Sequence, residues 1–142
     1  MKMKKIILIV EDLIEEQKIA KSVAVENGFG VVMTATLEDA FRLWKNLGDK
    51  IVGIVTDLHF PEKENGTDAA NPNGLAVIIE AITKNVPVVV CSNINHHYAE
   101  YLKVVISGLE KLSGKRIPFT MDRKDWSIAI TELKKIIGGI TK

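Results

Sequence analysis

At 142 residues, with 46% hydrophobic and 26% charged residues, the chain has the size and composition of one water-soluble globular domain with a hydrophobic core. The net charge of +1 excludes a general electrostatic attraction to nucleic acid or to an anionic membrane, and the apolar runs are too short to cross a bilayer. Cys91 is the only cysteine, so no disulfide can form within the chain. The N-terminus lacks the pattern of a secretory signal, and we therefore expect a cytoplasmic protein.

Strand and helix patterns alternate five times along the sequence. The expected strands are short apolar runs, typical of strands that helices cover on both faces. They span Lys5–Val10, Gly30–Ala35, Ile51–Thr56, Pro87–Cys91 and Ile117–Met121. The expected helices repeat apolar residues at helical spacing. They span Leu13–Asn27, Leu37–Leu47, Gly74–Lys84, His96–Leu112 and Trp126–Ile137.

Capping residues and glycines predict where several helices begin and end. Asn27-Gly28 is a typical stop for the first helix, and Thr36 with Asp39 resembles a capping box at the start of the second. Gly138-Gly139 indicates the end of the last helix and the start of a frayed tail.

The apolar stripes of the last three helices predict which faces are buried. For the third helix, the inward residues are expected to be Leu75, Ile78, Ile79 and Ile82. For the fourth, they are Tyr98, Leu102, Val105, Leu109 and Leu112. For the fifth, they are Trp126, Ala129, Ile130, Leu133 and Ile137.

This alternation predicts an α/β fold with right-handed crossovers and a doubly wound, five-stranded parallel sheet covered by helices on both faces. We expect one domain over residues 1–138 and a C-terminal tail over residues 139–142. The sequence contains no internal repeat and no low-complexity tract.

Polar groups follow three of the expected strands. Glu11-Asp12 follows the first strand, Asp57 the third and Ser92 the fourth. Parallel strands place these groups at one edge of the sheet, where open α/β folds bind their ligands. Three carboxylates gathered there without obvious neutralising partners repel one another, and Mg²⁺ suits such a set.

These motifs together resemble the receiver domains of two-component response regulators, over nearly the whole chain. The resemblance depends on five strand–helix pairs in the right order and on three quoted segments. They are Ile7-Leu8-Ile9-Val10-Glu11-Asp12, Val55-Thr56-Asp57-Leu58-His59-Phe60-Pro61 and Pro87-Val88-Val89-Val90-Cys91-Ser92.

The resemblance implies a flavodoxin-like sheet with strand order 2-1-3-4-5 and a phosphoryl group carried on Asp57. Mg²⁺ would be held by Asp12 directly, by Glu11 through a water molecule, by Asp57 and by the backbone carbonyl of His59. Ser92 would donate its hydroxyl to a phosphoryl oxygen. Carboxylates are workable nucleophiles toward activated phosphoryl groups, which supports the acceptor role independently.

The fifth strand departs from the family pattern. The family has a lysine at the end of this strand, and here Lys124 is our choice, with Arg123 as the neighbouring alternative. A different register would put Asp122 there and remove the cation. The aromatic switch position would be Phe119 or Met121.

Two further departures lie beside the expected site. A polar insertion, Glu62–Asn73, precedes Gly74, which would be the glycine that the family has soon after Pro61. We expect a surface loop there that could shield the acceptor. Asn93 follows Ser92 where the family commonly has a small residue, and could crowd the site.

Structural interpretations compete with these roles. Asp12 could cap the first helix, Ser92 the turn into the fourth, and Asp57 a turn. His96-His97 could be a metal ligand pair, although adjacent helical residues point about 100° apart. Glu62, Glu64 and Asp68 could reach a cation, although a solvated loop is the better interpretation.

We interpret the chain as a stand-alone receiver, phosphorylated by a histidine kinase or phosphotransfer protein. It would signal to a separate protein through the surface of its fourth helix, fifth strand and fifth helix, with a homodimer possible and no direct nucleic-acid or membrane contact. Candidate contact residues are Tyr98, Tyr101 and Trp126, although Tyr98 and Trp126 also fit the core.

Two alternatives remain. The first is a degenerate receiver that docks partners without phosphorylation, and it is distinguished by whether a cation from Arg123 or Lys124 reaches Asp57. The second is a metal-dependent phosphatase or other hydrolase, which would need a second acid where His59 stands.

Overall fold

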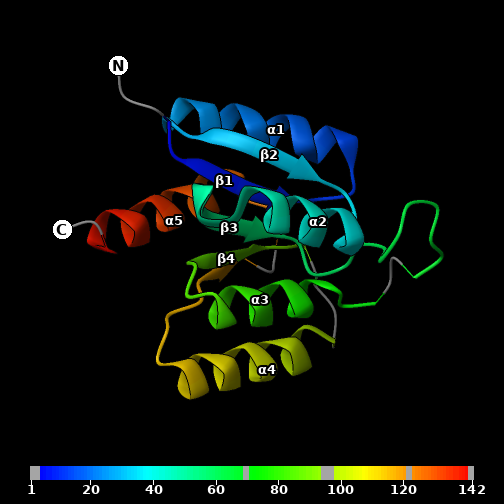
Figure 1. The fold of residues 1–142 in the computed structure, drawn as a ribbon. Coiled ribbons are helices and arrows are strands. Elements are labelled where there is room, and N and C mark those ends of the chain that lie inside the picture. Colours follow the sequence, from blue (N-terminus) through cyan, green and yellow to red (C-terminus); the bar gives the residue numbers. More distant parts are fainter. Residues whose placement is uncertain (1–3, 69–70, 94–97, 121–122, 141–142) are drawn as a thin grey trace.

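The computed structural model describes residues 4–68, 71–93, 98–120 and 123–140, and for residues 98, 99 and 140 only the backbone. One parallel sheet has the strand order β2-β1-β3-β4-β5, as expected (Figure 1). Its strands are β1 Ile6–Val10, β2 Gly30–Thr34, β3 Ile51–Thr56, β4 Val88–Cys91 and β5 Phe119–Thr120. The helices are α1 Ile14–Glu26, α2 Leu37–Leu47, α3 Gly74–Thr83, α4 Tyr98–Ser113 and α5 Trp126–Ile140, with a short 3-10 turn η1 at Gly48–Lys50.

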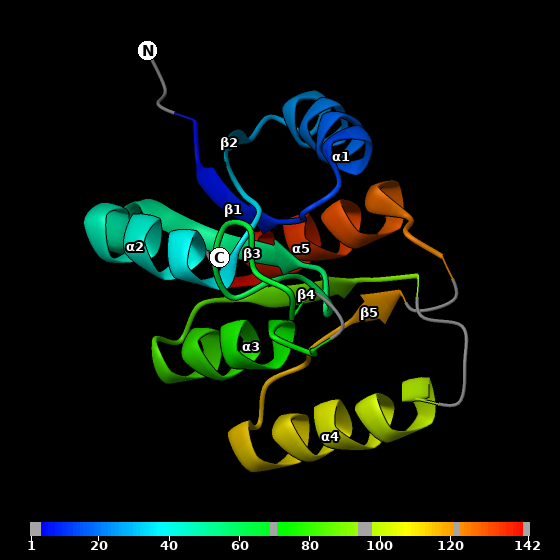
Figure 2. The same ribbon diagram turned by 90° about the vertical axis from the view of Figure 1, so that its right-hand side faces the viewer.

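Helices cover both faces of the sheet, and strands β1 to β4 contribute apolar side chains to the cores on both sides (Figure 2). In β1, Ile7 and Ile9 pack toward α1 and α5, whereas Leu8 and Val10 pack toward α2, α3 and α4. This alternation explains why the strands read as unbroken apolar runs. Among the described residues, no helix is long and apolar enough to cross a membrane.

The expected caps of α1 and α2 are confirmed. The hydroxyl oxygen of Thr36 accepts a hydrogen bond from the backbone N–H of Asp39 at 3.1 Å. α1 ends before Asn27, and Gly28 follows with a φ of 86°, a conformation that glycine adopts without strain. Leu13 occupies the N-cap position of α1, so the interpretation of Asp12 as the cap of this helix is wrong.

The expected inward faces of α3 and α4 are partly wrong. Ile79 is 51% exposed, because the face that α3 buries consists of Gly74, Val77, Ile78 and Ala81. Gly74 lies against Asp57 and Leu58, the residues that follow β3. Leu112 is 88% exposed, because the packed face of α4 is centred on Ile106.

All five residues expected on the inner face of α5 are buried. The expected helix stop at Gly138-Gly139 is wrong, since α5 continues to Ile140. Neither glycine adopts the positive φ that would end the helix there. Gly53 of β3 lets α5 pack closely, because a Cβ atom at this position would lie 2.9 Å from the Ile137 side chain.

Candidate functional site

Three backbone hydrogen bonds place the predicted site residues at the C-terminal edge of the sheet. Each extends a strand ladder by one residue, with lengths of 2.9 Å, 2.9 Å and 2.8 Å. They are Glu11 N–H to Thr34 O, Asp57 N–H to Val10 O and Ser92 N–H to Thr120 O. The side chains that follow β1, β3 and β4 therefore have fixed origins on neighbouring strands, and all three residues are buried.

Asp57 is held from two sides. Its Oδ1 accepts a hydrogen bond from the Leu58 backbone N–H at 2.7 Å. Behind it, α3 begins so close that a Cβ atom at Gly74 would stand 2.2 Å from the Asp57 carbonyl oxygen. Only glycine fits this contact, which explains why the helix after the insertion begins with Gly74.

Three carboxylates meet in front of β1 and β3. One oxygen from each of Glu11, Asp12 and Asp57 can be chosen so that all lie within 4.8 Å of one another. Within the described ranges this is the one acidic or histidine group compact enough to hold a metal ion. Oxygen ligands at such spacing suit Mg²⁺.

Lys124 compensates part of this negative charge. Its Nζ lies 2.5 Å from Glu11 Oε1 and 3.1 Å from Asp57 Oδ2, and its side chain is 6% exposed. Arg123 is 82% exposed and pairs instead with Asp125 at 3.6 Å. The carboxylates therefore have a neutralising partner, and of the two candidate cations it is Lys124 that reaches Asp57.

Burial dominates the electrostatics of the site. It raises the pKa of Glu11 to about 7, although the hydrogen bond from Lys124 works against this shift. Burial also raises the pKa of Asp57, more strongly than the charge of Lys124 lowers it. Burial lowers the pKa of Lys124, because it disfavours the charged amine. The hydrogen bond to Glu11 and the charge of Asp57 outweigh this effect, so the pKa of Lys124 is raised. One buried cation thus faces an excess of carboxylate, which favours binding of a further cation.

The Ser92 hydroxyl is buried and, in the part of the chain described, has no hydrogen-bond partner. Buried hydroxyl groups are usually paired, so this unpaired one, at the same edge of the sheet as the carboxylates, is a donor still available to a ligand oxygen. Asn93 is exposed and, with Asp12 and Lys124, lines an open depression of about 910 Å³ at the starts of α1 and α5.

Other predicted residues are partly resolved. His59 is half-buried in the loop after β3, and the role of its carbonyl stays a prediction. Phe119 packs against the core on the α2, α3 and α4 side of the sheet. Met121, Asp122 and the pair His96-His97 lie outside the described residues, and the side chain of Tyr98 is not described.

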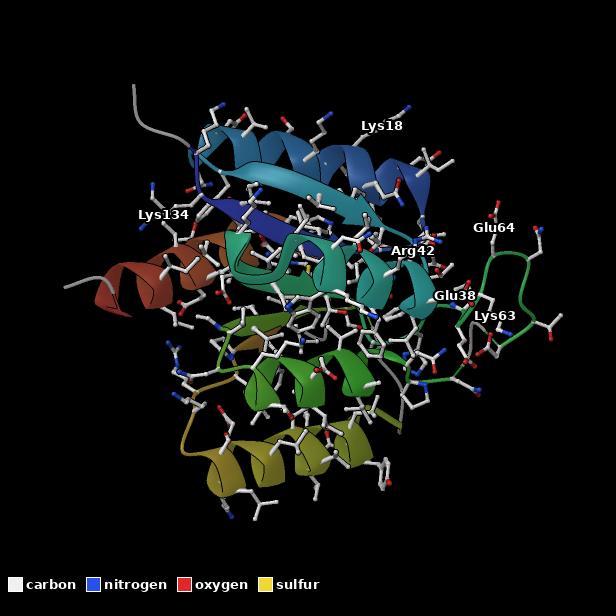
Figure 3. The ribbon with its side chains drawn as sticks, in the orientation of Figure 1. Lys18, Glu38, Arg42, Lys63, Glu64 and Lys134 are labelled. Carbon is white, nitrogen blue, oxygen red and sulfur yellow. The ribbon has the colours of Figure 1, made fainter. Side chains whose placement is uncertain are left out.

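The insertion after Pro61 is tied at its neck. The Asp68 carboxylate accepts hydrogen bonds from Glu62 N–H at 3.1 Å and from Asn73 Nδ2 at 3.1 Å. Asn73 Nδ2 also donates to the Phe60 carbonyl at 2.7 Å. Glu64 is exposed and points away from the body of the molecule (Figure 3). The loop projects from the C-terminal edge of the sheet, and its Asp68 carboxylate accepts hydrogen bonds that hold the two ends of the loop together.

The same loop caps α2. The carbonyls of Pro61 and Glu62 accept hydrogen bonds from the N–H groups of Leu37 and Glu38, at 3.1 Å and 2.9 Å. These donors belong to the first turn of α2 and have no partner within the helix. Pro61 and the first residue of the insertion therefore bind the start of α2, a contact that no local pattern in the sequence signals.

Comparisons with known proteins show which fold the chain has. No family model matches the sequence, and no curated protein does. A response regulator receiver protein from Sinorhizobium medicae WSM419 is 19% identical, with 95% of each chain covered and a TM-score of 0.68. The signal receiver domain of a histidine kinase from Syntrophus aciditrophicus is 17% identical, covering 97% of this chain and 93% of that one at a TM-score of 0.67.

A CheY-like receiver domain protein from Methanospirillum hungatei JF-1 is 14% identical, with 96% of each chain covered and a TM-score of 0.67. At such low identities, the likeness establishes the architecture. The chain has the flavodoxin-like receiver fold, as its motifs predict.

Proposed function

We propose that this chain is a receiver and signalling switch, phosphorylated on Asp57 with Mg²⁺ by a histidine kinase or phosphotransfer protein. One observation carries the proposal. In a receiver fold, Lys124 Nζ lies 3.1 Å from Asp57 Oδ2, beside a carboxylate cluster that suits a divalent cation. A carboxylate nucleophile and a fixed cation are the parts that phosphoryl transfer requires.

The step is a displacement at phosphorus. An Asp57 carboxylate oxygen forms a new O–P bond while the donor's bond to phosphorus breaks, and the bonding electrons leave with the donor. The broken bond is P–N for a phosphohistidine and P–O for acetyl phosphate. The product is an acyl phosphate on Asp57. Lys124 stands where it can pair with a phosphoryl oxygen, while Leu58 N–H keeps the carboxylate in orientation.

The residues fit Mg²⁺. Their donor set consists of carboxylate oxygens from Glu11, Asp12 and Asp57, and the His59 carbonyl is the further ligand we propose. When bound, the ion would relieve the repulsion of the carboxylates and neutralise charge on the phosphoryl oxygens.

The readout of phosphorylation would begin at Ser92. Its unpaired hydroxyl can donate to a phosphoryl oxygen, and a phosphorylated aspartate offers strong acceptors. Phe119, on the neighbouring strand β5, is our candidate for the aromatic switch residue, which would change position after Ser92 does. The change would reach a partner protein, or a second copy of the chain, through the surface of α4, β5 and α5.

Exposed side chains on α4 support this output surface. Tyr101 is 67% exposed and Val104 is 70% exposed, which suits them to a protein contact. Trp126 is buried, so it belongs to the core rather than to this surface. A cytoplasmic location and the absence of direct contact with nucleic acid or membrane remain parts of the proposal.

The observations weigh against both alternatives. A degenerate receiver would lack a cation at Asp57, whereas Lys124 reaches it. A hydrolase of the haloacid-dehalogenase kind would need a second acid two residues after the nucleophile, where this chain has His59.

The test is intact mass after incubation with Mg²⁺ and acetyl phosphate, beside Asp57→Ala. A gain of one phosphoryl group by the parent and none by the variant supports the proposal. No gain by either protein, together with undetectable Mg²⁺ binding by calorimetry, would replace it with the docking module.

A further inference from the structure

Three side-chain hydrogen bonds close a ring around the start of α1. Lys124 Nζ donates to Glu11 Oε1 at 2.5 Å, Trp126 Nε1 donates to Glu16 Oε1 at 3.3 Å, and Gln17 Nε2 donates to the Glu11 carbonyl at 2.6 Å. Short stretches of backbone, 124–126 and 16–17, complete the circuit. The ring thus joins the end of β1, the first turn of α1 and the start of α5.

The strand ladder does not extend to Lys124. The described residues of β5 are Phe119 and Thr120, which pair with Val90 and Cys91 of β4. Lys124 stands beyond the end of this strand and immediately before Asp125. Its position therefore depends on what holds the start of α5.

Asp125 caps α5. Its Oδ1 accepts a hydrogen bond from the Ile128 N–H at 3.0 Å, and its carbonyl accepts one from the Ala129 N–H at 3.0 Å. These bonds fix Lys124 relative to α5, because the lysine precedes the cap by one residue. They do not fix α5 relative to the carboxylates, which are carried by β1 and β3.

Trp126 and Glu16 supply that second link. The Trp126 ring is buried in the core with Ala20 and Ala24 of α1 and Ala129 of α5. Apolar contact sets how deep the ring lies, whereas its N–H bond to Glu16 sets the direction in which it points. α1 is in turn tied to Glu11, whose Oε2 accepts the Leu13 N–H at 2.9 Å. The Trp126–Glu16 bond thus connects α5, which follows Lys124, to α1, which is tied to Glu11. Glu11 is the residue that Lys124 contacts.

We propose that Glu16 is a positioning residue for Lys124, acting through the Trp126 indole N–H and the start of α5. Its effect on phosphoryl transfer rests on the function proposed above, but its effect on the place of Lys124 does not. Glu16 touches neither Asp57 nor Lys124 in any hydrogen bond or ion pair of the described residues, so the indole bond is its route.

The primary experiment measures the protection of the Lys124 amine. The protein is treated briefly with an amine-acetylating reagent in EDTA, and labelling of each lysine is followed by peptide mass spectrometry. In the parent, Lys124 should be protected, since its side chain is 6% exposed. In Glu16→Ala, its labelling should accelerate several-fold. Glu16→Gln keeps a side-chain oxygen that can accept the indole bond, and should retain protection.

A matched control separates the bond from the charge. Glu15 lies in the same turn of α1 and is exposed, so Glu15→Ala removes an equal charge without removing any of the three side-chain hydrogen bonds described above. It should leave Lys124 protected. Trp126→Phe keeps an aromatic ring but lacks the N–H donor, and should behave like Glu16→Ala. The buried thiol of Cys91 reports unfolding, because it should stay unreactive toward a thiol reagent in every folded variant.

The outcomes decide the proposal. Parent-like protection of Lys124 in folded Glu16→Ala, or equal loss in Glu15→Ala, would overturn it. A second arm follows phosphorylation by acetyl phosphate with saturating Mg²⁺, where Glu16→Ala should be slower by about tenfold and Glu16→Gln close to the parent. If the parent itself gains no phosphoryl group, the proposed function fails while the labelling arm still decides the positioning role.

Discussion

Lys124 Nζ lies 3.1 Å from Asp57 Oδ2 although the lysine stands beyond the end of β5. The same amine bonds Glu11, so one buried cation serves two buried carboxylates. Such an arrangement is costly to break, because a buried charge left without its partner retains its desolvation penalty.

Lys124→Met should therefore destabilise the metal-free protein by about 3 kcal/mol at neutral pH. Arg123→Met is the matched control, since that side chain is 82% exposed, and should change stability by less than about 0.5 kcal/mol. Urea unfolding in EDTA measures both. Mg²⁺ should restore part of the stability lost in Lys124→Met, because it supplies positive charge to the same carboxylates. Equal effects of the two substitutions would contradict the assignment of Lys124.

The stability of the metal-free protein should fall as the pH rises from about 4.5 to about 7. Burial raises the pKa of Glu11 from 4.5 to about 7, so in this window the folded state binds more protons than the unfolded state. The raised pKa of Asp57 acts in the same direction. Urea unfolding at several pH values in EDTA measures the slope. Glu11→Gln should flatten it, and a slope unchanged by this substitution would show that other groups cause it.

Gly74→Ala should destabilise the protein by 2 kcal/mol or more, on the order of an overpacked core. The added Cβ atom would lie 2.2 Å from the Asp57 carbonyl oxygen and 2.7 Å from the Leu58 Cα, so α3 or the end of β3 must move. Gly108→Ala is the control, because nothing lies within 4 Å of its Cβ position inside α4. It should raise stability by about 0.5 kcal/mol. Thermal unfolding compares them, and a neutral Gly74→Ala would contradict the close contact.

Much of the fold and the centre of the site could be predicted from the sequence, since both depend on local patterns. Apolar runs covered on two faces identify the strands. The carboxyl ends of adjacent parallel strands then bring Glu11, Asp12, Asp57 and Ser92 to one edge. Gly74 could be singled out as a glycine, but the reason for it lies in a contact with a residue 17 positions earlier.

The parts that could not be predicted depend on long-range geometry. The segment from Ile117 to Asp125 has too little alternation of apolar and polar residues to fix a strand register from the sequence, so Lys124 and Arg123 could not be separated. The Trp126–Glu16 bond joins residues 110 positions apart, and nothing in either segment signals it. On α4, apolar residues lie on both the packed and the exposed sides, which hides the true core face of that helix.

Asp68→Ala should open the neck of the insertion. The substitution removes the acceptor for Glu62 N–H and for one bond of Asn73 Nδ2. Lys63 is exposed and adjacent to this neck, so trypsin should cut after it faster in the variant than in the parent. Glu64→Ala is the control, as its exposed side chain makes no hydrogen bond that we find in the described loop. Peptide mass spectrometry locates the cut, and identical cleavage rates would mean that Asp68 does not hold the loop.

Ser92→Ala should affect the stability of the resting protein and of the phosphorylated protein differently. Because the buried hydroxyl has no partner among the described residues, its removal should leave the stability of the unmodified protein unchanged or raise it by up to about 1 kcal/mol. With Mg²⁺ and beryllofluoride, which imitates a phosphoryl group on an aspartate, the parent should gain more stability than the variant, because only the parent can donate the hydroxyl to the new acceptor. Thermal unfolding with and without the ligand measures the difference. Equal gains in the two proteins would remove Ser92 from the switch and leave its burial unexplained.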